Sequence, residues 1–427
     1  MQKQLDIEKF SKQIYLILTI IMAVKIAGFF TWSENVAITR VFKVFSRIAM
    51  TIAAYYVFKH ILKKGGVDSF KWNNVFSPLL YGGYLLLGFI SFMWSTKPSH
   101  SSLQWFMDLE SFVFCYYYMK SFEVLEVFFP KANVKFYHIL ANASFLIILI
   151  FIIGLMIAPD EFYRMTHGGE EARLGGYMMN PNELGMLCVV SICCYIFNLY
   201  RNHRKVWTII KILLVLYALI LTGSRSSMIG FLLVVFFHIR QSDNIKLKLA
   251  INVGAVFSIP VIVQTIFIKQ GDVEEVLSMT GRLPFWTALL NEGLPREPWF
   301  GFGFMRIAYK DYFKGVHTYA GQMTHNTFIQ VLMNLGFVGF GLVLLQMIAT
   351  IRGFLNFEDK EKKLMLLGIL IPILINSFTE FGIFGETNYG ILFYQLLIFG
   401  ISFKYHPILT RSEKLFLKRT RPDLSFP

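Results

Sequence analysis

The sequence predicts an all-α membrane protein that crosses the bilayer about twelve times. Hydrophobic residues make up 55% of its 427 residues and charged residues only 16%, whereas a soluble domain carries about 25% charged residues. Runs of about 20 apolar residues, enough for a helix to cross a hydrocarbon core of about 30 Å, recur along nearly the whole chain. The net charge of +14 is typical of nucleic-acid binding in a polar chain. In a chain this apolar, basic residues are expected in cytoplasmic loops instead, so we expect no nucleic-acid partner.

The expected spans follow one another with mostly short connections. They run at residues 11–31, 41–59, 78–95, 103–120, 136–158, 180–200, 206–222, 224–239, 248–268, 325–351, 363–380 and 388–404. The seventh and eighth are separated only by Thr222-Gly-Ser-Arg-Ser-Ser227, but together they are too long for one crossing. The first span lacks a small-residue cleavage site, so we expect it to remain in the protein. The four Cys lie in apolar runs without metal or redox spacing and are expected to be buried.

Basic residues predict the orientation of this single membrane domain (1–427). With the N-terminus placed in the cytoplasm, the inner loops hold about twice as many Lys and Arg residues as the outer ones. This bias predicts that both termini are cytoplasmic. Residues 405–427 then form a basic cytoplasmic tail that contacts membrane lipids. Residues 269–324 form a large extracytoplasmic loop between the ninth and tenth spans, and its many aromatic residues argue against disorder.

Two motifs that contain an Arg lie where helices are expected to start on the outer side of the membrane. In the segment from Arg173 to Gly185, Asn180 and Pro181 are typical of a helix start. Arg173 is unfavourable near a helix N-terminus unless an anion is present. The segment Thr222-Gly-Ser-Arg225 is a tight turn, and its Arg is either an anion ligand, together with Ser224 and Ser226, or a side chain that reaches lipid headgroups.

Two further motifs lie in the large loop and at its end. In Thr280-Gly-Arg-Leu-Pro-Phe-Trp286, Arg282 could clamp a phosphate while Trp286 stacks on a sugar ring, although a surface Arg beside an interfacial Trp is the equal alternative. His325 opens a helix with Asn326 or Thr324 as its cap. The positive helix end favours a neutral imidazole, which can act as a general base. If His325 is not the base, an outer carboxylate such as Glu380 or Asp311 is the next candidate.

Several motifs are absent from the sequence. It contains no P-loop, no paired-His metal motif and no outer Asp-x-Asp pair. We therefore expect Arg rather than a metal ion to serve any phosphate chemistry, and we expect no cofactor. Gly336, Gly339 and Gly341 are interpreted as positions of close helix packing.

Taken in order, these motifs resemble the O-antigen ligase/polymerase family of bacterial membrane proteins. The resemblance depends on Arg173–Gly185, Thr222–Arg225, Gly281-Arg282 with Gly301-Phe-Gly303, and His325-Asn326 with Gly336-Phe-Val-Gly339, and it covers roughly residues 170–345. It implies a GT-C-like fold in the bacterial inner membrane. It also implies transfer of a glycan from an undecaprenyl-pyrophosphate carrier on the outer leaflet, with inversion and without a metal.

The resemblance also implies roles for individual residues. Arg225 and Arg282 hold the donor pyrophosphate, His325 is the base on the acceptor hydroxyl, and Arg173 is carried over less firmly as a substrate ligand. We expect Ser224, Ser226, Asn326 and Trp286 to contact the substrate as well. Polymerases pass the glycan to another carrier-linked unit and ligases pass it to a different lipid acceptor. We expect a polymerase, with a ligase as the alternative. Expected partners are the carrier-linked oligosaccharide donor and acceptor, together with flippase and chain-length regulator proteins.

Other classes of protein remain as alternatives. A transporter or lipid-linked-glycan flippase has twelve helices too, but such proteins often show repeats and broken helices. We identify neither in the sequence, and charged residues at mid-span positions are scarce. A membrane scaffold would not need three outer Arg and a helix-capping His.

Overall fold

The computed structural model describes residues 2–65, 75–166, 171–199, 205–240, 282–304, 324–357, 359–380, 382–385 and 388–402, with isolated positions at 245, 249, 253, 415, 418 and 419. Most of the predicted ninth span, Asp311 and most of the basic tail lie outside the described residues. So do the parts of the predicted outer loop before 282 and between 305 and 323.

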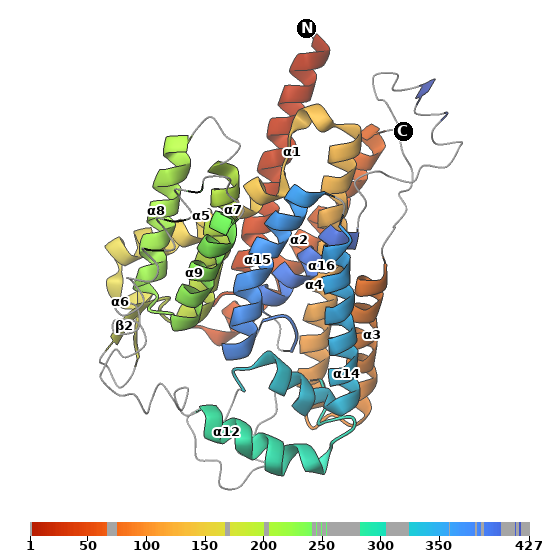
Figure 1. Cartoon of the computed structure of the whole chain (residues 1–427), viewed down its shortest axis with the longest axis vertical. Coiled ribbons are helices and arrows are strands. Elements are labelled where there is room, and N and C mark those ends of the chain that lie inside the picture. The colour runs from red at the N-terminus through yellow and green to blue at the C-terminus, as the bar shows by residue number, and fades with distance from the viewer. Residues whose placement is uncertain are drawn as a thin grey trace.

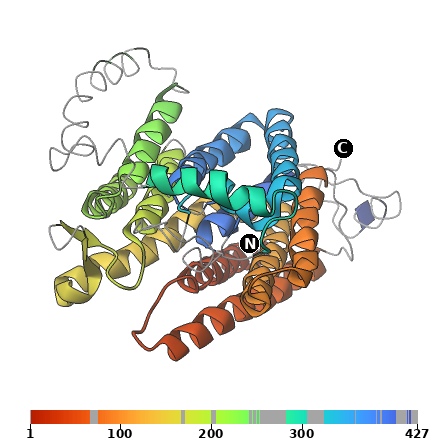
Figure 2. The same ribbon diagram turned by 90° about the horizontal axis from the view of Figure 1, so that it is seen from below.

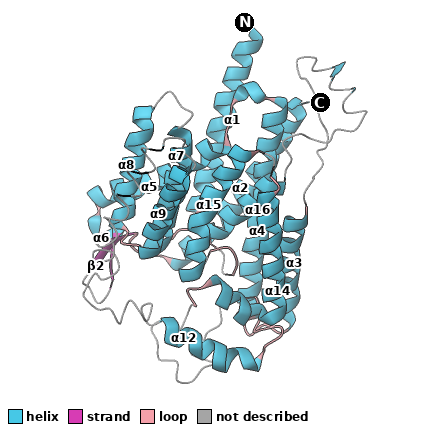
Figure 3. Ribbon diagram, viewed as in Figure 1, coloured by secondary structure: helices cyan, strands magenta, loops and turns pink. Residues whose placement is uncertain are grey.

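The described chain is almost entirely helical (Figure 3). The longer helices are α1 (Gln2–Ala27), α2 (Val36–Gly65), α3 (Phe76–Ile90), α4 (Pro98–Phe128), α5 (Phe136–Ile157), α7 (Pro181–Leu199), α8 (Lys205–Leu221), α9 (Arg225–Arg240), α14 (Thr327–Leu355), α15 (Lys360–Thr379) and α16 (Tyr389–Ser402). Short elements are η1 (Ser91–Met93), η2 (Pro130–Ala132), α6 (Pro159–Phe162), α12 (Arg282–Ala288), the π-turn η5 (Leu289–Gly293) and η6 (Leu294–Arg296). The strands β1 (Tyr163–Thr166) and β2 (Glu171–Leu174) pair as an antiparallel hairpin.

The helices match the predicted spans closely. Every predicted span except the ninth contains a long helix, and the seventh and eighth are separate helices, α8 and α9. Within the described residues, seven helices are long and apolar enough to cross a membrane: α1, α2, α3, α5, α7, α14 and α15. The all-α membrane fold is therefore confirmed, whereas the count of twelve and the GT-C-like arrangement stay predictions.

The long helices run side by side along the molecule and enclose one large apolar core (Figure 1). The N-terminus of α1 lies at one end and α12 lies across the other, where Figure 2 shows it crossing the ends of the bundle. Phe285 and Leu289 on this crossing segment are buried against Phe302 and Met333. Residues of the predicted outer loop thus pack as an ordered cover on one end of the bundle.

The interior also holds charge that the sequence interpretation did not expect. Lys25 of α1 and Arg47 of α2 both pair with Glu110 of α4, and all three side chains are buried. Asp108 is also buried and accepts hydrogen bonds from Tyr81 and Gln395. Charged residues at span positions are thus not scarce, and pairing reduces the cost of removing them from water.

Helix α14 is broken, which corrects two sequence interpretations. Gly336 has φ 62° and ψ −161° in its middle, a conformation that only glycine adopts readily. We interpreted this glycine as a packing residue and identified no broken helix in the sequence. The break divides α14 into a short half-helix, residues 327–335, and a longer C-terminal part.

Candidate functional site

The ends of four helices meet at the α12 end of the bundle. α7 and α9 start there, the half-helix 327–335 of α14 starts there, and α15 ends there. Three of these ends carry the motifs predicted from the sequence. Each end exposes unpaired backbone groups that side chains must satisfy, and this requirement positions the residues described below.

Glu380 lies at the centre of this meeting point. It follows the last residue of α15, and its side chain is only 5% exposed. His325 Nδ1 lies 2.6 Å from Glu380 Oε2, and Arg282 Nη2 donates to Oε1 at 3.1 Å. Asn182 Nδ2 donates to Oε1 at 2.7 Å. One carboxylate therefore joins α7, α12 and the start of α14.

The carboxylate needs these partners for two reasons. Burial by itself would raise the pKa of Glu380, and a negative charge at a helix C-terminus is unfavourable. The charge and hydrogen bond of His325, the charge of Arg282 and the hydrogen bond of Asn182 outweigh burial and lower the pKa of Glu380 to about 2. Glu380 is thus ionised at neutral pH.

The contact with Glu380 orients the His325 imidazole. A carboxylate can only accept, so Nδ1 carries the hydrogen and Nε2 is the ring atom that can accept a proton. The backbone of His325 has φ +49°, an uncommon conformation for a residue with a side chain. Such strain is often found at functional sites, and here it accompanies a turn directly before α14.

Asn326 is the N-cap of α14, as predicted. Its side-chain oxygen accepts hydrogen bonds from the backbone N–H groups of Phe328 and Ile329 at 2.9 and 3.1 Å. Its Nδ2 donates to the Phe378 carbonyl at 3.2 Å. Asn326 therefore fixes the start of one helix to the end of another, and its role as a substrate ligand stays a prediction.

Arg282 and Trp286 both lie on α12. Arg282 donates to the Thr379 carbonyl in addition to Glu380, so it also caps the C-terminus of α15. Trp286 Nε1 donates to the Thr324 carbonyl at 2.6 Å, and its ring packs beside the cluster around Phe285. Both side chains are half-buried next to His325, and contact with a substrate stays a prediction for each.

Arg173 is held by the protein at two points. Its Nε donates to the Thr222 carbonyl at 2.7 Å and its Nη2 donates to Asn182 Oδ1 at 2.8 Å. Because Asn182 binds Glu380, Arg173 joins the same network. The β-hairpin thus places Arg173 beside the turn that precedes Arg225.

Ser224 caps the start of α9 in the turn between α8 and α9. Ser224 Oγ accepts from the Ser227 backbone N–H at 3.3 Å and is buried. The Ser226 hydroxyl oxygen lies 3.4 Å from the Ser224 hydroxyl oxygen. The guanidinium of Arg225 is half-buried, and within the described part of the chain it makes no hydrogen bond or ion pair. Arg225 therefore differs from Arg173 and Arg282, which the protein already engages.

The structure brings most of the predicted site residues together. Arg173, Arg282 and His325 share one network through Asn182 and Glu380, and Asn326 and Trp286 flank it. The sequence predicted Asn182 only as part of a segment that starts a helix. It predicted Glu380 only as a second candidate for the base. The available signal for Glu380 was its position, since it is an acid at the outer end of the predicted span 363–380.

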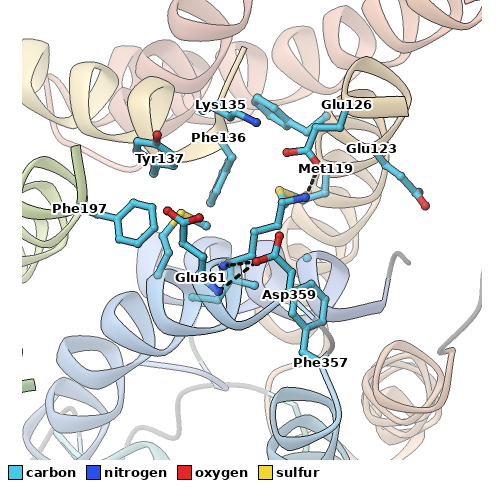
Figure 4. Close-up of a pocket in the computed structure, with 15 residues that line it drawn as sticks. Met119, Glu123, Glu126, Lys135, Phe136, Tyr137, Phe197, Phe357, Asp359 and Glu361 are labelled. Carbon is cyan, nitrogen blue, oxygen red and sulfur yellow. Dashed lines mark hydrogen bonds and ion pairs between the residues drawn. The ribbon is translucent and has the colours of Figure 1, made fainter. Parts of the chain in front are cut away.

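The structure also has a cavity at the opposite end of the bundle (Figure 4). Its volume is about 160 Å³, and it is lined by the C-terminal part of α4 and the start of α15, among others. Its polar side chains include Asp359, which caps α15, and Glu126, which pairs with Lys362. These groups stabilise helix ends and are separate from the Glu380 network.

Within the described residues, no group of three or more His, Cys, Asp or Glu side chains could hold a metal ion. The groups around Glu380 are the guanidinium of Arg282, the imidazole of His325 and the amide of Asn182. The arrangement offers an oriented imidazole beside Arg side chains, which is suited to removing a proton from a hydroxyl while an anion is bound nearby.

Comparison with protein families identifies the segment that holds most of this site. Residues 210–344 match the family model described as O-antigen ligase. The matched segment includes Arg225, Arg282, His325 and Asn326, whereas Arg173 and Glu380 lie outside it. The resemblance to the O-antigen ligase/polymerase family is thereby confirmed. A comparison with curated proteins gave no match.

Proposed function

Starting from this family match, we propose that the chain is a membrane glycosyltransferase of the O-antigen ligase/polymerase type. It would transfer an oligosaccharide from an undecaprenyl-pyrophosphate donor to an acceptor hydroxyl at the outer leaflet of a bacterial inner membrane. The observation that carries this proposal is the 2.6 Å contact between His325 Nδ1 and Glu380 Oε2. This contact leaves Nε2 of His325, which lies within the matched segment, available to act as a base.

The proposed reaction is a single displacement that inverts the anomeric carbon. The acceptor hydroxyl oxygen forms a bond to that carbon while the bond to the pyrophosphate oxygen breaks. His325 Nε2 takes the hydroxyl proton, and Glu380 stabilises the imidazolium that forms. The electron pair of the broken bond leaves with undecaprenyl pyrophosphate.

Arg225 is the proposed ligand of the leaving pyrophosphate. Its charge lies at the N-terminus of α9, where free N–H groups also favour an anion. Negative charge grows on the pyrophosphate as the bond breaks, so a fixed guanidinium stabilises the transition state more than the ground state. Arg282 adds a second positive charge beside the base, and Arg173 and Asn182 hold Glu380 in position.

The acceptor is either a second carrier-linked unit or a different lipid. We favour polymerisation of repeat units into O-antigen, capsule or exopolysaccharide, while the description of the matched family, O-antigen ligase, supports the ligase alternative. Gene deletion followed by analysis of lipid-linked glycans distinguishes them. Single units left on the carrier indicate a polymerase and long unattached chains indicate a ligase. Units retained on the inner leaflet would contradict both and indicate a flippase.

The mechanism is tested with purified protein and an undecaprenyl-pyrophosphate-linked oligosaccharide. We expect His325→Ala to lower turnover by about 10²–10⁴-fold, as is typical for loss of a general base, with donor binding kept. His60→Ala is the control, because His60 is an exposed residue of α2. Full activity of His325→Ala, or loss of wild-type activity in EDTA, would show that the metal-free mechanism is wrong.

A further inference from the structure

A loop that precedes α14 in the chain, residues 298–303, packs against the break in this helix. At Gly336 the helix cannot make its regular hydrogen bonds, and residues 298–303 make them instead. Phe302 and Gly303 donate to the carbonyls of Met333 and Asn334 at 3.0 and 2.8 Å. In return, the N–H groups of Phe337 and Val338 donate to the carbonyls of Pro298 and Trp299 at 2.8 and 3.1 Å.

Two glycines make this close approach possible. A Cβ on Gly336 would overlap the Trp299 backbone and lie 2.6 Å from Phe300 N. A Cβ on Gly301 would lie 2.5 Å from the carbonyl carbon of Asn334. Both glycines have φ +62°, so a side chain at either position would meet both steric overlap and backbone strain.

The loop is also fixed to the helices beside it. The Phe304 N–H donates to Ser91 Oγ at 2.9 Å, and the Thr96 N–H donates to the Phe302 carbonyl at 3.2 Å. Phe302 is buried against Met333 and against Phe285 of α12. One segment therefore contacts α3 and its following turn, the crossing helix α12 and the half-helix that starts after His325.

We propose that this backbone interlock between residues 298–303 and the break at Gly336 is a positioning device for the reaction. It holds the half-helix 327–335 at a fixed angle, and it fixes α12 to the same unit. His325 and Arg282 then contact the two carboxylate oxygens of Glu380 in one rigid arrangement. Gly336 and Gly301 are positioning residues, since neither residue contacts the proposed reacting atoms.

The kinetic part of this inference rests on the proposed function. A misplacement of about 1 Å can cost about 100-fold in rate, so we expect Gly336→Ala and Gly301→Ala to lower kcat by about 10- to 100-fold. The donor KM should stay within about twofold, because Arg225 lies on a different helix. Gly341→Ala is the matched control, since its Cβ would meet nothing within 4 Å.

A milder variant serves where these glycine variants fail to fold. Ser91→Ala leaves the glycines intact but removes the acceptor of the Phe304 N–H. We expect a smaller fall in kcat, of about 3- to 10-fold, again with the donor KM kept. The thermal unfolding temperature of each variant is measured in the same detergent, so that a slow but folded variant is distinguished from a damaged one.

Amide hydrogen exchange gives a readout that does not depend on activity. The N–H groups of Phe302, Gly303, Phe337 and Val338 should exchange slowly in the wild type. Gly336→Ala and Ser91→Ala should accelerate exchange there and also at Phe328 and Ile329, which follow His325, whereas Gly341→Ala should not. Wild-type kcat in Gly336→Ala, or fast exchange of the four amides in the wild type, overturns the inference. If the wild type transfers no glycan, the proposed function fails, and exchange at Phe328 and Ile329 alone decides whether the interlock holds the half-helix.

Discussion

At the scale of single residues, Glu380 explains how an imidazole, a guanidinium and an amide come together at one point. A buried carboxylate at a helix C-terminus is costly without cations. Arg282 supplies positive charge, and His325 and Asn182 supply further hydrogen bonds. The carboxylate in turn fixes which ring nitrogen of His325 holds the hydrogen.

Replacement of Glu380 should separate charge from shape. We expect Glu380→Gln to lower kcat by about 10²–10⁴-fold, because an amide cannot stabilise the imidazolium and can favour the wrong tautomer. Glu183→Gln is a control at a half-buried Glu close to the start of α7. An unchanged kcat in Glu380→Gln would remove the carboxylate from the mechanism.

The lowered pKa of Glu380 also predicts how stability depends on pH. The pKa is about 2 in the folded protein and about 4.3 in an unfolded chain. The ionised carboxylate therefore stabilises the fold above about pH 4.3, and this contribution is lost as the pH falls toward 2. Thermal unfolding measured from pH 3 to 7 should show a steeper acid loss in wild type than in Glu380→Gln. Parallel curves for the two proteins would contradict the lowered pKa.

Arg225 should behave differently from the other arginines. We expect Arg225→Ala to reduce chain formation by about 10²–10³-fold with little change in unfolding temperature, since the described structure gives its guanidinium no partner. Arg225→Lys should rescue poorly, because an ammonium cannot bind phosphate through two parallel hydrogen bonds. Arg240→Ala, at the other end of α9, is the control. Polymer of wild-type length in Arg225→Ala at equal expression would exclude it as the pyrophosphate ligand.

At the scale of elements, charge as well as apolar packing joins the first helices. Glu110 of α4 binds Lys25 of α1 and Arg47 of α2 inside the bundle. Arg47 also donates to the Met107 carbonyl at 2.7 Å. The three helices are therefore specified as neighbours by a buried ionic cluster.

This cluster predicts a large effect of one isosteric change. Glu110→Gln leaves two buried cations without their counter-ion, and breaking such a pair costs about 3–5 kcal/mol. We expect a clear fall in the unfolding temperature and in the yield of folded protein. Glu8→Gln is the control, because Glu8 pairs with Lys12 at an exposed position. Equal unfolding temperatures for Glu110→Gln and wild type would show that the cluster is energetically unimportant.

At the scale of the whole molecule, the arrangement of helix ends agrees with the predicted topology. α12, whose Arg282 binds Glu380, lies at the end opposite to the N-terminus (Figure 1). A donor on the outer leaflet requires this end to face outward. The orientation itself is a prediction, based on the distribution of Lys and Arg.

Cysteine labelling tests the orientation directly. The native Cys115, Cys188, Cys193 and Cys194 are buried, so background labelling should be low. We expect Asn291→Cys, at an exposed position beside α12, to react with an impermeant thiol reagent in spheroplasts. Lys64→Cys, exposed near the end of α2, should react only after lysis. The reverse pattern would overturn the predicted topology and place the site on the cytoplasmic side.

The sequence by itself determined the class of fold, the positions of the helices in the described residues and the resemblance to the O-antigen ligase/polymerase family. Long apolar runs form helices in a bilayer because their backbone groups must be hydrogen-bonded within the segment. Short polar segments between these runs, such as Asn180-Pro181 and the turn with Ser224, mark where helices start. The motif order identified Arg173, Arg225, Arg282 and His325 because those residues lie at predicted outer ends. Each of these signals is local in the chain.

Only the tertiary structure decided which of those residues act together. Glu380 lies 55 positions from His325 and 98 from Arg282, and no local pattern specifies that the three meet. The break at Gly336 was equally hidden, because a glycine in an apolar helix is compatible with close packing as well as with a break. Its role depends on residues 298–303, whose backbone supplies the missing hydrogen bonds. Contacts between distant segments depend on how whole helices pack, and that packing is a property of the complete core rather than of any single run of residues.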